Sequence, residues 1–149
     1  MDFIKKHIEW LPALAIVIIL GGSLPFKFGG SAETAHIFDV VGQFLGLEFF
    51  RTTGGYIIGA AELVACILLL IPAMRALGAL LTVGIMAGAI TFHLFSPLGV
   101  TVQWMENGEM QEDGTLFYMA IIAFLCGVWL VLRKKDDLLQ MIGKGSASE

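Results

Sequence analysis

The sequence predicts an all-α protein: a four-helix transmembrane bundle with an external amphipathic helix between the first and second spans and both termini cytoplasmic. Of its 149 residues 57% are hydrophobic and only 15% are charged, and the mean hydropathy is +0.83. This composition is too apolar for a soluble domain of that size. Four apolar stretches also approach the roughly 20 residues that a helix needs to cross hydrocarbon. We therefore expect one membrane domain over residues 1–149.

The four spans are expected at about 10–28, 54–72, 76–95 and 116–132. Backbone polar groups within lipid must bond inside their own segment, and no strand-like alternation runs through these stretches, so helices are the reasonable assignment. Aromatic rings favour the headgroup level, and four lie at or just beyond span ends: Trp10, Tyr56, Trp104 and Tyr118. The remaining tail, 133–149, begins with a basic cluster that would stop transfer and attract anionic lipid, and its Gly- and Ser-rich end is expected to be disordered.

The distribution of basic residues predicts the orientation in the membrane. Placing both termini inside puts seven of the nine Lys and Arg residues in the cytoplasm and leaves Lys27 and Arg51 outside. This asymmetry satisfies the positive-inside rule and indicates the cell's cytoplasmic (inner) membrane. The loop 99–114 carries four acids and no basic residue, so it belongs outside.

Two structured pieces are expected on the outer side. In the connection 29–53, Ser31 can cap a helix whose apolar residues recur at helical spacing, and Gly46 can end it. An ordinary solvated loop is the alternative. Farther on, Val100, Val102 and Trp104 alternate with polar residues before the turn pair Asn107-Gly108, which favours a small hairpin.

Glu62 is the first candidate for a functional site, because it lies inside the second span. A charge near the centre of a membrane helix costs about 3 kcal/mol on insertion scales, so such residues are rare and usually functional. From the rise per residue, Glu62 lies about 12 Å below the outer boundary, whereas His93 and Lys27 lie near that boundary. The depth difference argues against a direct bond between Glu62 and His93. We expect the three to handle a ligand or protons near the outer side.

Each of these residues also has a purely structural interpretation. Glu62 can be an acid bonded to a neighbouring helix, His93 an interfacial histidine, and Lys27 a side chain that snorkels to water. Arg51 and Tyr118, at outer span ends, are secondary candidates, as are Cys66 and Cys126.

The small residues of the second span share a face with its acid. Gly55, Gly59, Glu62 and Cys66 follow spacings of four, three and four residues. The third span is expected to be the packing partner of the second. It carries Gly84 and Gly88 on one stripe and Gly78, Thr82, Met86, Ala89 and His93 on another. Cys66 and Cys126 lie at similar depths, so a pair is sterically conceivable, but free cysteines in a core are the simpler expectation.

No haem, nucleotide or metal motif is found in the sequence, and an acidic net charge of -4 argues against nucleic acid as a partner. Only one histidine lies within a span, which argues against a bis-histidine haem. The expected surroundings are the lipid bilayer, together with a small lipophilic ligand or a partner membrane or redox protein. The close-packing glycines also allow a homo-oligomer.

Several short pieces in a fixed order resemble the DoxX family of small four-helix membrane proteins. They are Gly-Gly-Ser-Leu-Pro-Phe-Lys-Phe at 21–28, the stretch 38–45, Gly-Ala-Ala-Glu-Leu at 59–63, Leu-Leu-Leu-Ile-Pro at 68–72 and Gly-Ala-Ile-Thr-Phe-His-Leu at 88–94. The likeness extends from Leu11 to Leu132. It implies that Lys27, Glu62 and His93 occupy the positions of the family's recurrent polar residues.

Two functions follow as hypotheses. Some DoxX relatives are subunits of quinone-linked oxidising complexes or of membrane assemblies that detoxify thiol oxidants. The resemblance therefore implies a redox-associated membrane subunit that binds a quinone or another lipophile near Glu62, as a component of an oxidoreductase complex rather than a self-sufficient enzyme. The alternative is a non-enzymatic permease for a small molecule or ion, or an assembly partner of another membrane protein.

Overall fold

The computed structural model describes residues 2–147 as a helical bundle with one small hairpin. Four helices are long and apolar enough to cross a membrane, as the sequence predicts: α2 (Trp10–Gly29), α4 (Glu48–Leu70), α5 (Arg75–Phe95) and α6 (Thr115–Arg133). The remaining elements are α1 (Asp2–Ile8), α3 (Ala32–Leu45), the 3-10 turn η1 (Pro72–Met74), β1 (Val102–Glu106), β2 (Glu109–Asp113) and α7 (Lys135–Ala147). These spans place the chain in a lipid bilayer.

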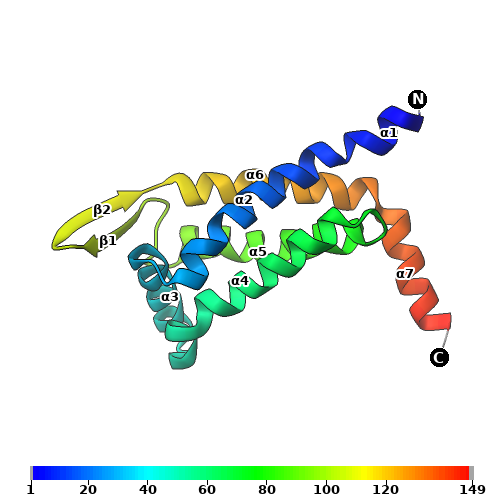
Figure 1. Cartoon of the computed structure of the whole chain (residues 1–149). Coiled ribbons are helices and arrows are strands. Elements are labelled where there is room, and N and C mark those ends of the chain that lie inside the picture. Colours follow the sequence, from blue (N-terminus) through cyan, green and yellow to red (C-terminus); the bar gives the residue numbers. More distant parts are fainter. Residues whose placement is uncertain (1, 148–149) are drawn as a thin grey trace.

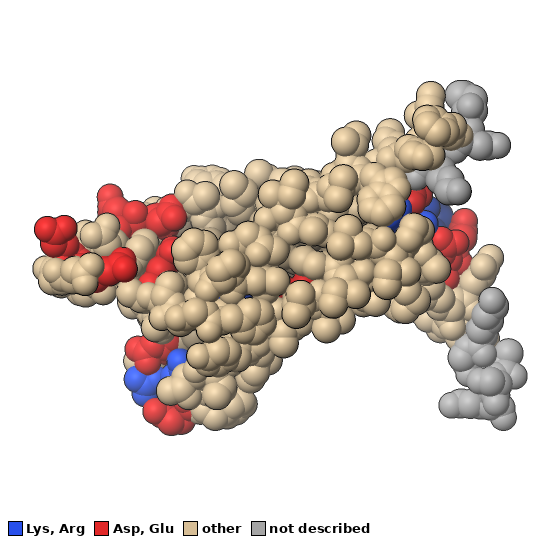
Figure 2. Space-filling view, in the orientation of Figure 1, with Lys and Arg blue, Asp and Glu red and all other residues tan. Residues whose placement is uncertain are grey.

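The four long helices run side by side (Figure 1), and their contacts close them into a ring. Helix α2 packs against α4 and α6, and α5 packs against the same two helices from the opposite side. Both termini lie at one end of the bundle, whereas α3 and the hairpin lie at the other (Figure 1). We call these the terminal end and the hairpin end. Charged residues gather at both ends, and the long middle of the visible face is uncharged at its surface apart from small traces (Figure 2).

Small side chains fill the centre of the ring. The core cluster contains Ala13, Ala65, Ala79 and Ala123 with larger residues such as Leu69, all fully buried. Gly78 brings α5 close to α4, since a Cβ there would lie 2.8 Å from the Leu69 backbone nitrogen. Large apolar side chains face outward instead, as expected where the solvent is lipid.

Helix α3 begins and ends at the residues that the sequence indicates. The Ser31 hydroxyl accepts a hydrogen bond from the Thr34 backbone N–H at 3.2 Å, and Gly46 ends the helix in the left-handed conformation (φ 70°). The helix packs against α4 and β1. Phe38 lies so close to Gly54 that a Cβ there would be 2.7 Å from its ring. This contact fixes α3 across the hairpin end of the bundle.

The predicted hairpin is confirmed. Strands β1 and β2 are antiparallel and pair Val102 with Asp113 and Glu106 with Glu109. Asn107 and Gly108 form the turn with positive φ values of 53° and 81°, the geometry that an Asn-Gly pair favours. Val102 is fully buried and joins Val41 and Leu98 in a second, smaller core beneath α3.

Three expectations need correction. The second spanning helix begins at Glu48, not near residue 54, because its first turns pack against α3. Gly42 of α3 makes this contact close: a Cβ on Gly42 would lie 2.8 Å from the Arg51 backbone nitrogen. The Gly- and Ser-rich end of the tail, expected to be disordered, belongs to a helix as far as Ala147. Two acids in the first turn of this helix favour its N-terminus. Residues 148–149 lie outside the described part. The third spanning helix does pack against the second, as expected, but it does so around Gly78, since no heavy atom lies within 4 Å of the Cβ position of Gly84 or Gly88.

Candidate functional site

The carboxylate of Glu62 is buried in the middle of α4 and is held by two side chains of α2. Only 3% of the residue is exposed. Its Oε2 lies 3.0 Å from Lys27 Nζ and 3.1 Å from Ser23 Oγ. Lys27 Nζ also donates to Ser23 Oγ at 2.9 Å. The acid is therefore ion-paired to a neighbouring helix, and Lys27 turns inward to it instead of snorkelling.

The local sequence explains why these three groups meet. Ser23 and Lys27 are four residues apart on α2, so they share one face of that helix. On α4 the facing position is Gly59, where a Cβ would lie 3.1 Å from the Phe28 ring and 3.4 Å from Lys27 Cβ. The small residues beside Glu62 thus lie against α2, whereas α5, the partner that the sequence suggested, packs against α4 around Gly78.

The Ser23 hydroxyl has more acceptors than protons. Its oxygen lies 2.8 Å from the Leu20 carbonyl oxygen and 3.1 Å from Glu62 Oε2, yet a hydroxyl donates only one proton. Lys27 Nζ donates to the Ser23 oxygen whether the hydroxyl proton points to Leu20 or to Glu62. The group can therefore redirect its hydrogen bond toward or away from Glu62 without moving a heavy atom.

These polar groups open into a cavity of about 590 Å³ that reaches all five helices from α2 to α6. Its walls are mainly apolar side chains, among them Ile58, Ile85 and Met119. Its polar lining comprises Ser23, Lys27, Glu33, Thr34, Glu62, His93 and Asp113. A cavity of this size, apolar with a few polar groups, is typical of sites for small ligands.

His93 lies on α5 at the same cavity but is not bonded to Glu62. Its ring is 6% exposed and packs edge-on to Phe117. Nδ1 lies 2.7 Å from the Gly99 carbonyl oxygen, which can only accept, so Nδ1 carries a proton. Because this bond occupies Nδ1, Nε2 is the ring nitrogen left for a ligand, with no hydrogen-bond partner among the side chains that the structure describes.

Sequence reasoning missed four polar residues of this site: Ser23, Glu33, Thr34 and Asp113. Glu33, in the first turn of α3, has one carboxylate oxygen buried without a hydrogen-bond partner in the described part of the chain. Burial raises its pKa, and the nearby carboxylates of Asp113 and Glu106 raise it further, against an opposing effect of Lys27. A Thr115 hydrogen bond keeps the pKa of Asp113 below its ordinary value. The serine could have been found by its spacing from Lys27, and the glutamate by its place just after the Ser31 cap.

The secondary candidates do not line this cavity. Arg51 is paired with Asp39 at 2.6 Å and with Glu48 at 3.0 Å near the start of α4. Tyr118 is 60% exposed on α6. Cys66 is buried in the central core and Cys126 lies in a groove between α2 and α6, and both are free thiols. Among residues 2–147, no three His, Cys, Asp or Glu side chains gather as metal ligands.

A sequence profile described as the DoxX-like family matches residues 13–98 of the chain. The matched segment contains α3, α4, α5 and most of α2, and it includes Lys27, Glu62 and His93. Neither the curated proteins nor the solved structures include a match to the chain.

Proposed function

The chain belongs to the DoxX-like family, and from that premise we propose that it is a redox-associated membrane subunit that binds a small lipophile, such as a quinone, in the cavity beside Glu62. The observation that carries this proposal is the cavity itself: about 590 Å³ of mainly apolar space with a buried ion pair on one wall and a histidine on another. An apolar molecule enters such a space from lipid without losing water of hydration. Its polar atoms need donors and acceptors inside the cavity.

The cavity can meet that need at two positions. Lys27 and Ser23 offer donors near Glu62, and His93 offers Nε2 on α5. A quinone ring fits the requirement for apolar walls with separated polar contacts, and it would supply the redox chemistry that these side chains cannot. The side chains would bind and orient the ring and hold protons at Glu62 Oε2 and His93 Nε2.

Glu62 is the group best suited to exchange a proton. Buried ionisable residues in membrane helices commonly act as proton relays or ligand contacts. The Ser23 hydroxyl can turn its single proton between Leu20 and Glu62, so a change in charge at the carboxylate needs little rearrangement. Lys27 limits the cost of keeping the carboxylate ionised, because it lies 3.0 Å away.

Purified protein is expected to retain quinone through gentle detergent extraction, or to change a quinone-dependent rate in membranes. Glu62→Gln removes the charge and should abolish this effect. Glu48→Gln is the matched control, since Glu48 lies on the same helix with 85% of its side chain exposed. An unchanged quinone content and rate in Glu62→Gln would remove the proposed role of this carboxylate.

A second variant tests the cavity independently of charge. Gly88 lines the cavity, and a Cβ at this position would meet no heavy atom within 4 Å. Gly88→Leu should therefore fill the cavity without a backbone clash and lower the retained ligand. If Gly88→Leu folds and binds quinone like the wild type, the ligand does not occupy this cavity.

The orientation with both termini in the cytoplasm is part of the proposal. It rests on the excess of basic residues at the terminal end, and it places the Glu62 cavity nearer the outer side of the inner membrane. Reporter fusions at the C-terminus that are active only in the cytoplasm or only outside it distinguish the two orientations. Activity of the external reporter would reverse the proposed topology.

An assembly partner for another membrane protein is the second candidate function. One observation favours it: Gly84, which also lines the cavity, is exposed, and no heavy atom lies within 4 Å of its Cβ position, so a helix from another chain could approach α5 closely. Isolation from native membranes should then recover one stoichiometric partner that Gly84→Leu releases. Recovery of the protein alone would count against this candidate.

A further inference from the structure

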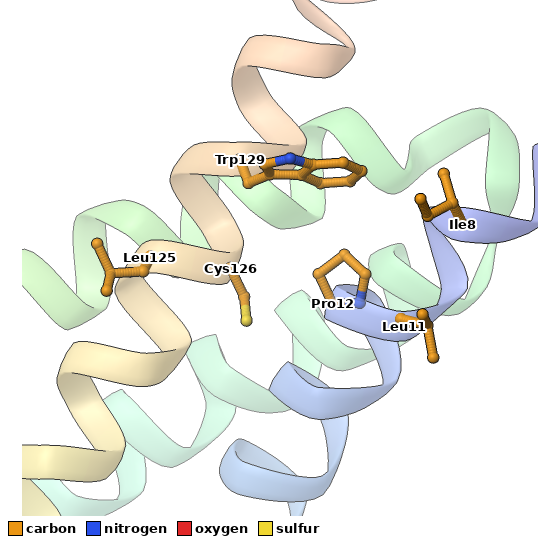
Figure 3. A pocket seen from close by; sticks show the side chains of 6 residues that line it. All are labelled: Ile8, Leu11, Pro12, Leu125, Cys126 and Trp129. Atoms are coloured by element: carbon orange, nitrogen blue, oxygen red, sulfur yellow. The ribbon is translucent and has the colours of Figure 1, made fainter. Parts of the chain in front are cut away.

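A second hollow lies on the opposite, terminal half of the bundle, away from the Glu62 cavity. It is a groove of about 290 Å³ between the start of α2 and the later turns of α6, lined by Ile8, Leu11, Pro12, Leu125, Cys126 and Trp129. Figure 3 shows the Trp129 indole projecting from α6 toward Ile8, with the Pro12 ring facing Cys126 below it. All six side chains are apolar or weakly polar, and the groove is open to the surroundings of the bundle.

A cluster of charged residues lies next to the terminal end of this groove. Glu9 follows Ile8 in the chain, and its two carboxylate oxygens are shared by three cations. The distances are 3.4 Å to Arg133, 3.2 Å to Lys134 and 3.6 Å to Arg75. One carboxylate cannot neutralise three cations.

Other contacts leave the positive charge in excess. Asp137 pairs with Lys134 at 3.3 Å, so the cluster has three cations against two carboxylates. Arg75 is fully buried over the Trp10 ring, and one of its terminal nitrogens has no hydrogen-bond partner among the described residues. Its charge cannot be dispersed into water. An anion at the surface of the cluster would relieve this excess.

Arg133 is the cation that joins the cluster to the groove. It is one helical turn beyond Trp129, and its guanidinium lies 5.2 Å from the centre of that ring. With 31% of its side chain exposed, it is more accessible than Lys134 at 14%. A ligand bound along the groove would therefore have its apolar part against Trp129 and its anionic part at Arg133.

We infer that this groove binds an acyl chain of one anionic phospholipid, whose phosphate contacts Arg133 beside Glu9. The apolar walls match a hydrocarbon chain, and Trp129 is one helical turn from the end of α6, a position where indole rings favour the headgroup level. The excess positive charge selects an anionic headgroup over a zwitterionic one. This site is independent of the proposed function at Glu62.

Tryptophan fluorescence in nanodiscs tests the site directly. In the full chain with Trp10→Phe and Trp104→Phe, Trp129 is the remaining indole. Phosphatidylglycerol brominated near the headgroup end of its acyl chains should quench it more than equally brominated phosphatidylcholine at the same mole fraction. The expected preference is roughly fivefold, the factor for one cation near an anionic lipid.

Variants separate a specific site from general attraction. Arg133→Gln should abolish the preference and Arg133→Lys should keep most of it, which also shows that the fold tolerates change at this position. Lys135→Gln is the control, because it removes the same charge from an exposed residue two positions away. Equal quenching by both lipids, or equal losses in Arg133→Gln and Lys135→Gln, would overturn the inference. Relief of quenching by excess inorganic phosphate would also overturn it, because the cluster would then bind the free anion.

Discussion

Breaking the ion pair between Lys27 and Glu62 should destabilise the fold unequally, depending on which partner is removed. At 3.0 Å the attraction is about 5.5 kcal/mol for an effective dielectric constant of about 20, and it offsets the cost of burying both charges. Lys27→Met leaves a carboxylate whose side chain is only 4% exposed. Removing one partner of such a buried pair is expected to cost about 3 kcal/mol of unfolding free energy.

Glu62→Gln should cost less, about 1 kcal/mol, because the glutamine can still bond to Ser23 and the free lysine can reach the surface at the end of α2. The double variant carries no buried charge, so it should also lose only about 1 kcal/mol. The coupling energy between the two positions is then about 3 kcal/mol, at the upper end for neighbouring residues.

Equilibrium unfolding by denaturing detergent in mixed micelles, followed by circular dichroism, gives the unfolding free energy of the wild type, of the two single variants and of the double variant. Arg51→Met serves as the control, since Arg51 and Asp39 form a more exposed pair and the change should be much smaller. If the two single effects at Lys27 and Glu62 simply add, leaving a coupling energy below about 0.5 kcal/mol, the reasoning about a buried pair is refuted.

Three further predictions follow from other contacts. The raised pKa of Glu33 means that the folded state holds its proton more tightly than the unfolded state, so this group lowers stability as the pH rises from its ordinary pKa through the raised one. Glu33→Gln should therefore raise the melting temperature at neutral pH and have little effect in acid, and an equal shift at both pH values would contradict this. Gly78→Ala should destabilise by about 1–3 kcal/mol, because its Cβ would lie 2.8 Å from Leu69 N, whereas Gly84→Ala meets nothing and should change stability by less than about 0.5 kcal/mol in chemical unfolding. Gly108→Val should melt the hairpin locally, since a β-branched residue strains at φ 81°; hydrogen exchange of the β1 and β2 amides should speed up while exchange in α5 stays unchanged.

Local signals predicted most of the helices and the hairpin. The lengths of the apolar stretches located the four spans, since backbone groups in lipid must form helices whatever their neighbours are. Ser31, Gly46 and the Asn107-Gly108 pair marked the ends of α3 and the hairpin turn, because caps and turns depend on residues close in the chain. The early start of α4 was missed because it depends on packing against α3. This is a tertiary contact, and local sequence signals do not show which segments meet.

For the candidate site, too, the sequence predicts which residues matter, and tertiary packing decides which of them meet. The position of Glu62 within an apolar stretch is enough to mark it as a costly charge, since the cost of a charge in lipid depends on residue type and depth. The same positional argument draws attention to Lys27 and His93 as polar residues near the outer boundary. The pairing of Glu62 with Lys27 through Ser23, and the separation of His93 from it, depend on which faces of α2, α4 and α5 meet. Helical periodicity defines a face but not the helix that covers it. Only the tertiary structure decided that the small residues beside Glu62 pack against α2, and that polar groups of both helices line one cavity that also reaches α3, α5 and α6.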